Sequence, residues 1–293
     1  MRRVVFVFLF VFVCLLFTDA AATFAQSQAP SAPPPVLQIF REEVKPGKTA
    51  THAKVEAGWP RAFANAKSTT HYLAMTSVTG PNEAWFLSGF PSLAAWEQDQ
   101  KNNDGNAALS AELTRLSQQD GELLNSVRSI AAVYRSELSY RPGVSVGTMR
   151  YFLVTTIRVR PGFENDFVES WKMVVAAHEK ANMNEHWAMY QVTAGGPAGT
   201  FLYFGALKSL AEVDSSVGMH SADTYQNAVG DEGRKRLREM NRAGTLNSET
   251  NYFAFSPSMS YPSPEFIAAD PSFWTPKPVV AAKKPSAQPA SQQ

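Results

Sequence analysis

Apolar positions along the central part of the chain recur with two different periods. Alternating or continuous apolar runs predict strands at residues 37–44, 71–79, 84–90, 130–138, 152–159, 186–194, 200–206 and 251–255. Helical spacing predicts helices between them, at residues 49–67, 92–127, 163–180 and 221–241, with Pro60 breaking or kinking the first. The pattern therefore gives the order strand, helix, strand, strand, helix, strand, and gives it twice.

The two halves of this pattern resemble copies of one another. Pro46-Gly47 and Pro161-Gly162 each follow an apolar run and a basic residue, and they lie 115 positions apart (161 minus 46). The copies end on similar segments, Leu138-Ser-Tyr-Arg-Pro142 and Met259-Ser-Tyr-Pro262. Landmarks kept in one order at a near-constant offset predict an internal duplication. We place the first domain at residues 36–142, a linker at 143–149 and the second domain at 150–262.

This element order predicts an α+β fold. Helices on one side of a four-stranded antiparallel sheet form the ferredoxin-like arrangement, which leaves the other sheet face bare. A second copy in the same chain would cover that face. The sequence therefore predicts two tandem ferredoxin-like domains with their antiparallel sheets packed face to face, paired within the chain, and it leaves a homodimer open.

The Pro-Gly turns, the hairpin around Gly80-Pro81-Asn82 and the apolar-aromatic third strand resemble the dimeric α/β-barrel superfamily. The tandem copy and the closing Ser-Tyr-Pro are most similar to NIPSNAP-like or antibiotic-biosynthesis-monooxygenase-like domains, over residues 36–262. The resemblance implies relatives that include cofactor-free oxygenases, haem enzymes of the chlorite dismutase-like type and proteins without known activity. Such a fold does not by itself decide function.

The ends of the chain have a different composition. Arg2-Arg3, the apolar run 4–17 and the small residues Ala22 and Ala25 predict a signal peptide at residues 1–25, too short for a membrane span. We therefore expect an exported protein, periplasmic or secreted, without a stable membrane anchor after cleavage. Residues 26–35 form a Pro/Ala-rich linker, and residues 263–293 a C-terminal extension predicted to be disordered from about residue 275.

Charge and cysteine content exclude several classes of function. The net charge is +1, so nothing indicates a basic face for nucleic acid. The only cysteine, Cys14, lies in the predicted signal peptide, so the mature chain has no disulfide and no thiolate chemistry.

Histidines and aromatic residues are the candidates for a ligand site. His178 shares one helical face with Phe163, Phe167, Trp171 and Val174, so it is either a core histidine or a ligand to haem iron. His71 and His186 open equivalent strands and precede Tyr72 and Trp187, which indicates either a paired site or capping at strand ends. His52 and His220 are predicted at the surface. No spacing typical of a metal site or cofactor loop is present, so none is predicted.

Three functions are compatible with these residues. The first is a binding or otherwise non-catalytic protein with a small apolar ligand, with His71, His178, His186, Trp171, Trp187 and Tyr72 as candidate ligand-binding residues. The second is a cofactor-independent monooxygenase, which needs a base such as His or Asp. The third is a haem protein that uses His178.

Overall fold

A computed structural model describes residues 32–216, 220 and 222–275. The predicted signal peptide, most of the predicted linker 26–35 and the tail from residue 276 lie outside these residues. The strands are β1 (Val36–Val44), β2 (Leu73–Ser77), β3 (Glu83–Phe90), β4 (Leu124–Tyr134), β5 (Tyr151–Val159), β6 (Ala188–Ala194), β7 (Thr200–Leu207) and β8 (Thr245–Phe255). They form one closed antiparallel barrel in the order β1-β3-β2-β8-β5-β7-β6-β4.

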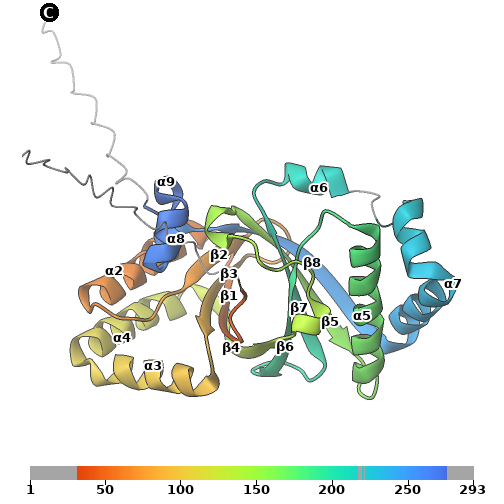
Figure 1. The fold of residues 1–293 in the computed structure, drawn as a ribbon. Coiled ribbons are helices and arrows are strands. Elements are labelled where there is room, and N and C mark those ends of the chain that lie inside the picture. Colours follow the sequence, from red (N-terminus) through yellow and green to blue (C-terminus); the bar gives the residue numbers. More distant parts are fainter. Residues whose placement is uncertain (1–31, 217–219, 221, 276–293) are drawn as a thin grey trace, which may run out of the picture.

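The helices cover the outside of this barrel on two sides. Those of the first half are α1 (Thr49–Glu56), α2 (Gly58–Asn65), α3 (Leu93–Gly105) and α4 (Ala107–Gly121). Those of the second half are α5 (Glu164–Ala181), α6 (Ala211–Ser216) and α7 (Asp223–Glu239), and a π-helical turn, η4 (Met240–Gly244), follows α7. Two short helices after the second half, α8 (Pro264–Ala269) and α9 (Pro271–Trp274), lie near α2 in Figure 1. In Figure 1, α2, α3 and α4 lie on one side of the barrel, and α5 and α7 lie on the other. No described helix is long and apolar enough to cross a membrane.

The expectation of two sheets packed face to face is wrong. Each half has the ferredoxin-like strand order, β4-β1-β3-β2 and β8-β5-β7-β6, but the halves join edge to edge through β2–β8 and β4–β6. A four-stranded sheet leaves unpaired backbone N–H and C=O groups along both edges. Joining the edges pairs those groups, and the twist of the strands lets the joined sheet close on itself. The bare sheet faces therefore meet inside one barrel.

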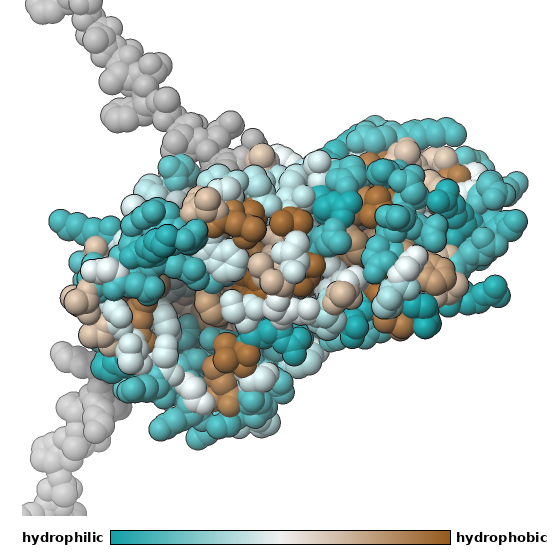
Figure 2. Space-filling view, turned by 90° about the horizontal axis from the view of Figure 1, so that it is seen from below, coloured by the Kyte–Doolittle hydropathy of each residue, from teal (hydrophilic) through white to brown (hydrophobic). Residues whose placement is uncertain are grey.

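Side chains from both halves fill the barrel interior. The buried cluster contains Leu37, Ile39, Met75, Trp85, Leu87, Ile130, Val154, Phe152, Leu202, Phe204, Phe253 and Phe255, among others. Separate apolar clusters lie between each sheet and its own helices. Figure 2 shows one face of the molecule, on which hydrophobic residues gather over the middle while the ends are mostly hydrophilic.

Segments that follow β4 and β8 clip each half to the other. Tyr140 pairs with Trp187 and Tyr261 pairs with Tyr72, in two isolated antiparallel bridges. Beside them, the hydroxyl of Ser139 accepts a hydrogen bond from the Met189 N–H (2.9 Å), and that of Ser260 accepts one from the Ala74 N–H (2.8 Å). We call the segments Leu138–Tyr140 and Met259–Tyr261 the closing clips. They contain the repeated Ser-Tyr pairs of the sequence, and each one is hydrogen-bonded to backbone groups of the other half.

Local departures from the predicted elements have simple causes. The first helix breaks between α1 and α2, and Pro60 lies in the first turn of α2, where its missing N–H needs no partner. β4 and β8 begin at Leu124 and Thr245, earlier than residues 130 and 251, because their first halves are mostly polar and exposed and show no apolar alternation.

Candidate functional site

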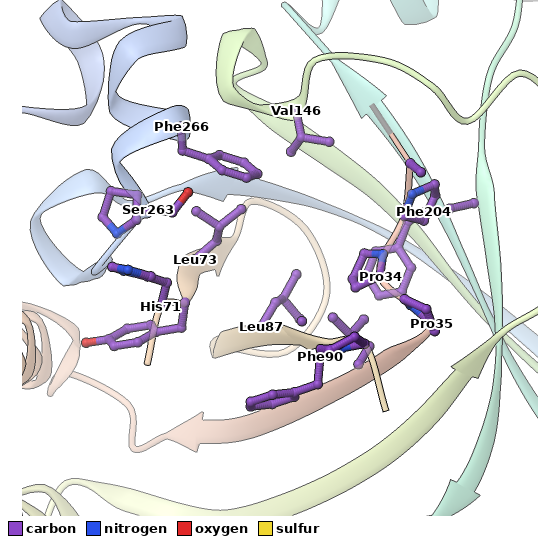
Figure 3. A pocket seen from close by; sticks show the side chains of 18 of the residues that line it. Pro34, Pro35, His71, Leu73, Leu87, Phe90, Val146, Phe204, Ser263 and Phe266 are labelled. Atoms are coloured by element: carbon purple, nitrogen blue, oxygen red, sulfur yellow. The ribbon is translucent and has the colours of Figure 1, made fainter. Parts of the chain in front are cut away.

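A large apolar cavity opens at the end of the barrel where β1, β2 and β6 begin. Its volume is about 920 Å³. We call it the mouth cavity. Apolar side chains from several elements surround it in Figure 3, namely Leu73, Leu87, Phe90, Val146, Phe204 and Phe266. A cavity of this size and lining is of the kind that holds small organic molecules.

Two of the candidate histidines line the mouth cavity from opposite halves. His71 Nδ1 lies 3.3 Å from the Tyr261 carbonyl oxygen, and His186 Nε2 lies 2.7 Å from the Ala206 carbonyl oxygen. A carbonyl only accepts, so these ring nitrogens donate, and in the neutral imidazole the other nitrogen is an acceptor. Each histidine is therefore hydrogen-bonded to a backbone carbonyl near a strand end and also lines the cavity, and a paired ligand site at these residues stays a prediction.

A second cavity of about 400 Å³ lies between α5, α7 and the sheet of the second half. Aromatic side chains form much of its wall, namely Phe167, Trp171, Trp187 and Tyr203. We call it the α5 cavity. His178, which is 1% exposed, reaches it from the inward face of α5 and packs its ring 4.7 Å from that of Trp187. Trp171 lines the α5 cavity and Trp187 lines both cavities, while Tyr72 is buried in the first half and lines the mouth cavity.

Three donor atoms converge at the edge of the α5 cavity. Glu185 Oε2 lies 2.8 Å from His178 Nε2 and 3.1 Å from His220 Nε2, and the two nitrogens are 3.1 Å apart. Burial opposes ionisation of Glu185, but hydrogen bonds from His178 and His220 and their charges outweigh it and lower its pKa to about 2. The hydrogen bond to Glu185 raises the pKa of His220.

This group has the composition and spacing of a metal-ligand set. Two imidazoles and one carboxylate form the donor set of many first-row transition-metal sites, and donors about 2.1 Å from one octahedral ion lie roughly 3.0 Å apart. His178 Nδ1 lies 2.7 Å from the Val174 carbonyl oxygen, an interaction of the kind that orients metal-bound histidines. Sequence spacing did not show the group, because His220 lies 42 residues from His178 and joins it only through the fold.

Haem does not fit His178 in this arrangement. Nδ1 is hydrogen-bonded to a backbone carbonyl, and Glu185 and His220 occupy the space in front of Nε2. Haem iron would need His178 Nε2 to face a porphyrin plane, and the Glu185 and His220 side chains stand in that position. The haem-protein function considered from the sequence therefore lacks its proposed iron ligand, His178.

No family model and no curated protein matches this chain. Among solved structures, it is similar to a "putative monooxygenase" from Fusobacterium nucleatum, with a TM-score of 0.50, 14% identity and coverage of 76% of this chain and 93% of that one. An anthrone oxidase-like protein gives a TM-score of 0.51 and 11% identity, with coverage of 78% of this chain and 93% of that one. A chlorite dismutase variant from Candidatus Nitrospira defluvii gives a TM-score of 0.47 and 11% identity, with coverage of 78% of this chain and 94% of that one.

These likenesses concern the fold. At 14% and 11% identity, the first two structures show that this chain shares their fold and no more. The resemblance to dimeric α/β-barrel proteins seen in the sequence is therefore supported at the level of the fold, and its NIPSNAP-like part stays a prediction. Proteins that share a fold often carry different activities, so the cavities and their side chains decide what can be proposed.

Proposed function

We propose that this protein binds a small, flat, largely apolar molecule in the mouth cavity. The observation that carries the proposal is the cavity itself, about 920 Å³ in volume and walled mainly by aliphatic, aromatic and proline side chains. His71 and His186 line the cavity from opposite halves, each with one ring nitrogen left to accept a hydrogen bond, which suits a ligand with one or two hydroxyl groups on an aromatic body.

Calorimetric titration with 2-naphthol and related aromatic phenols tests this proposal. Val146→Trp places a large side chain in the cavity and should abolish saturable binding, because Val146 points into it (Figure 3). Val127→Trp is the matched control, since Val127 is 61% exposed on β4 and does not line the cavity. His71→Ala should weaken binding about 3- to 10-fold, the effect of one lost neutral hydrogen bond. Unchanged binding in Val146→Trp would contradict the proposal.

A second candidate is oxygenation of an aromatic substrate in the α5 cavity. The group of His178, Glu185 and His220 beside aromatic walls supports it. The names of two similar solved structures, a "putative monooxygenase" and an anthrone oxidase-like protein, support it as well. In the cofactor-independent form, the group would accept a proton from an activated CH₂ of the substrate. The carbanion would react with O₂, the CH₂ would become a carbonyl, and the second oxygen atom would leave as water.

Oxygen uptake with an anthrone-type substrate tests this candidate. The wild type should consume O₂, and Glu185→Gln should lose most of the rate because the carboxylate no longer supports either histidine. Uptake that survives EDTA would favour the cofactor-independent form, whereas uptake restored only by added Fe²⁺ or Mn²⁺ would favour an ion at the three donors. No uptake under any of these conditions would rule out the candidate.

We further propose that the chain is exported after removal of residues 1–25 and that it arose by duplication of a NIPSNAP-like or monooxygenase-like unit. The basic start, the short apolar run and the small residues before Gln26 support export. The same strand order in both halves supports duplication. Mass spectrometry of the mature N-terminus after cell fractionation tests export, and a cytoplasmic, full-length product would contradict it.

A further inference from the structure

Four ionisable side chains meet between β1 and the helices of the first half. Glu42 lies on β1, His52 and Glu56 lie on α1, and Asp120 lies near the end of α4. Their exposed fractions are 9%, 2%, 3% and 3%, so His52 is buried and its predicted surface position is wrong. One donor atom from each lies within 4.8 Å of those of the others. We call this group the acidic cluster.

Its polar atoms are not satisfied by the protein alone. His52 Nε2 lies 2.9 Å from Glu42 Oε2 and 3.5 Å from Asp120 Oδ1. Within the described residues, Glu56 Oε1 and Asp120 Oδ1 have no hydrogen-bond partner, and no lysine or arginine forms an ion pair with the three carboxylates. If all three carboxylates were ionised, a protonated histidine would balance only one of their three negative charges. Buried carboxylates without compensation are costly, so a cation or bound protons must accompany them.

The fold does not require polar residues at these positions. Ile157, Phe167 and Trp171 stand 115 positions after Glu42, His52 and Glu56 in the sequence, on β5 and α5, the counterparts of β1 and α1. There the same three positions carry apolar side chains that line the α5 cavity, and the Phe167 and Phe201 rings lie 4.4 Å apart. The first half therefore places ionisable groups at positions where the second half has apolar side chains.

We propose that the acidic cluster binds one divalent first-row transition-metal ion, such as Mn²⁺ or Zn²⁺. Three carboxylates and one imidazole supply hard oxygen donors and one nitrogen, and the imidazole favours such ions over Ca²⁺ or Mg²⁺. Donors about 2.1 Å from one ion lie roughly 3.0 to 4.2 Å apart, so only small side-chain movements separate the present spacing from coordination. The ion would use the two carboxylate oxygens that lack partners.

The ion has a structural role in this proposal. None of the four residues lines the mouth cavity or the α5 cavity. Coordination would tie together one strand and two helices that are distant in sequence. Such an ion stabilises the folded state in proportion to its free concentration, because the unfolded chain does not hold the donors together.

Metal content and spectroscopy of the full mature chain test the proposal. Protein stripped with EDTA and dialysed against Mn²⁺ or Zn²⁺ should retain about one equivalent at the cluster, measured by plasma mass spectrometry. Its melting temperature should rise with metal concentration. Glu56→Gln should lose that equivalent and the rise, whereas Glu185→Gln, which alters the separate group at the α5 cavity, should keep both.

A second readout does not depend on the stability of that variant. Pulsed electron paramagnetic resonance of wild-type protein loaded with one equivalent of Mn²⁺ should show coupling to a ¹⁴N nucleus that disappears in His52→Gln and remains in His220→Ala. The proposal is overturned if stripped wild-type protein binds no ion at millimolar concentration. It is equally overturned if wild type and Glu56→Gln retain the same metal content.

Discussion

Removing the hydroxyls of the closing clips should destabilise the barrel at its two seams. Ser260 Oγ accepts from the Ala74 N–H and donates to the Ser256 carbonyl oxygen at 2.7 Å. Ser139 Oγ accepts from the Met189 N–H and donates to the Arg135 carbonyl oxygen at 2.8 Å. Ala74 and Met189 are fully buried, so substitution of either serine by alanine leaves a backbone N–H without a partner and without access to water.

The expected loss follows from that unsatisfied group. A buried donor left without a partner costs about 1–3 kcal/mol, so we expect each single Ser→Ala change to lower the free energy of unfolding by about 2 kcal/mol. The clips act at different seams and share no partner, so the double change Ser139→Ala and Ser260→Ala should cost about 4 kcal/mol. Against a typical stability of roughly 5–15 kcal/mol, the double variant should remain folded but less stable.

Urea unfolding followed by tryptophan fluorescence measures these losses. Ser258→Ala is the matched control, because Ser258 is exposed just before the clip and makes only one long hydroxyl contact, 3.4 Å from Ser256. Single losses below about 0.5 kcal/mol, or a control as damaging as Ser260→Ala, would refute the reasoning that buried clip hydroxyls hold the seams.

Three other changes test the packing of the barrel and its surroundings. Gly195→Ala should lower the melting temperature far more than Gly162→Ala, since both have positive φ but only at Gly195 would a Cβ overlap a backbone oxygen, that of Ser129; equal shifts would contradict the steric argument. Phe201→Ala should cost about 3–5 kcal/mol in urea unfolding, because the ring is fully buried against α5, and a cost under 1 kcal/mol would show that the site collapses. Glu83→Gln should cost about 1.5–3 kcal/mol by the same assay, because Glu83 is buried between Arg41 and the Trp85 indole N–H, and an unchanged midpoint would count against this.

The local parts of this fold could be predicted from the sequence. The inward face of α5 is visible in the spacing of Phe167, Trp171 and His178, and the helix break near Pro60 follows from proline chemistry. The pairing of β2 with β8 could not be predicted in the same way. The pairing of edge strands depends on long-range closure of the sheet, and no residue pattern in β2 or β8 specifies the other strand as its partner.

The candidate sites also include one that the sequence indicated and two that only the fold brings together. Sequence symmetry pointed to His71 and His186, which line one cavity from both halves. His220 reached His178 and Glu185 only through the fold, and the acidic cluster was missed because its residues come from one strand and two helices. A signal was present in His52 and Glu56, four residues apart on one helix face, with Glu42 on the preceding strand. Reading those residues together required knowing that this face is buried.

The closing clips also bear on how the chain matures. When the first half leaves the ribosome, the β4 edge stays unpaired until β6 has been made, and the β2 edge stays unpaired until β8, the last strand, has been made. Closure then joins residues nearly two hundred positions apart, such as Tyr72 and Tyr261, which places this barrel among folds of high contact order that form slowly. A nascent chain cut short before β8 would leave the edges of β2 and β5 unpaired, whereas co-expressed halves should be able to complete one barrel from two polypeptides.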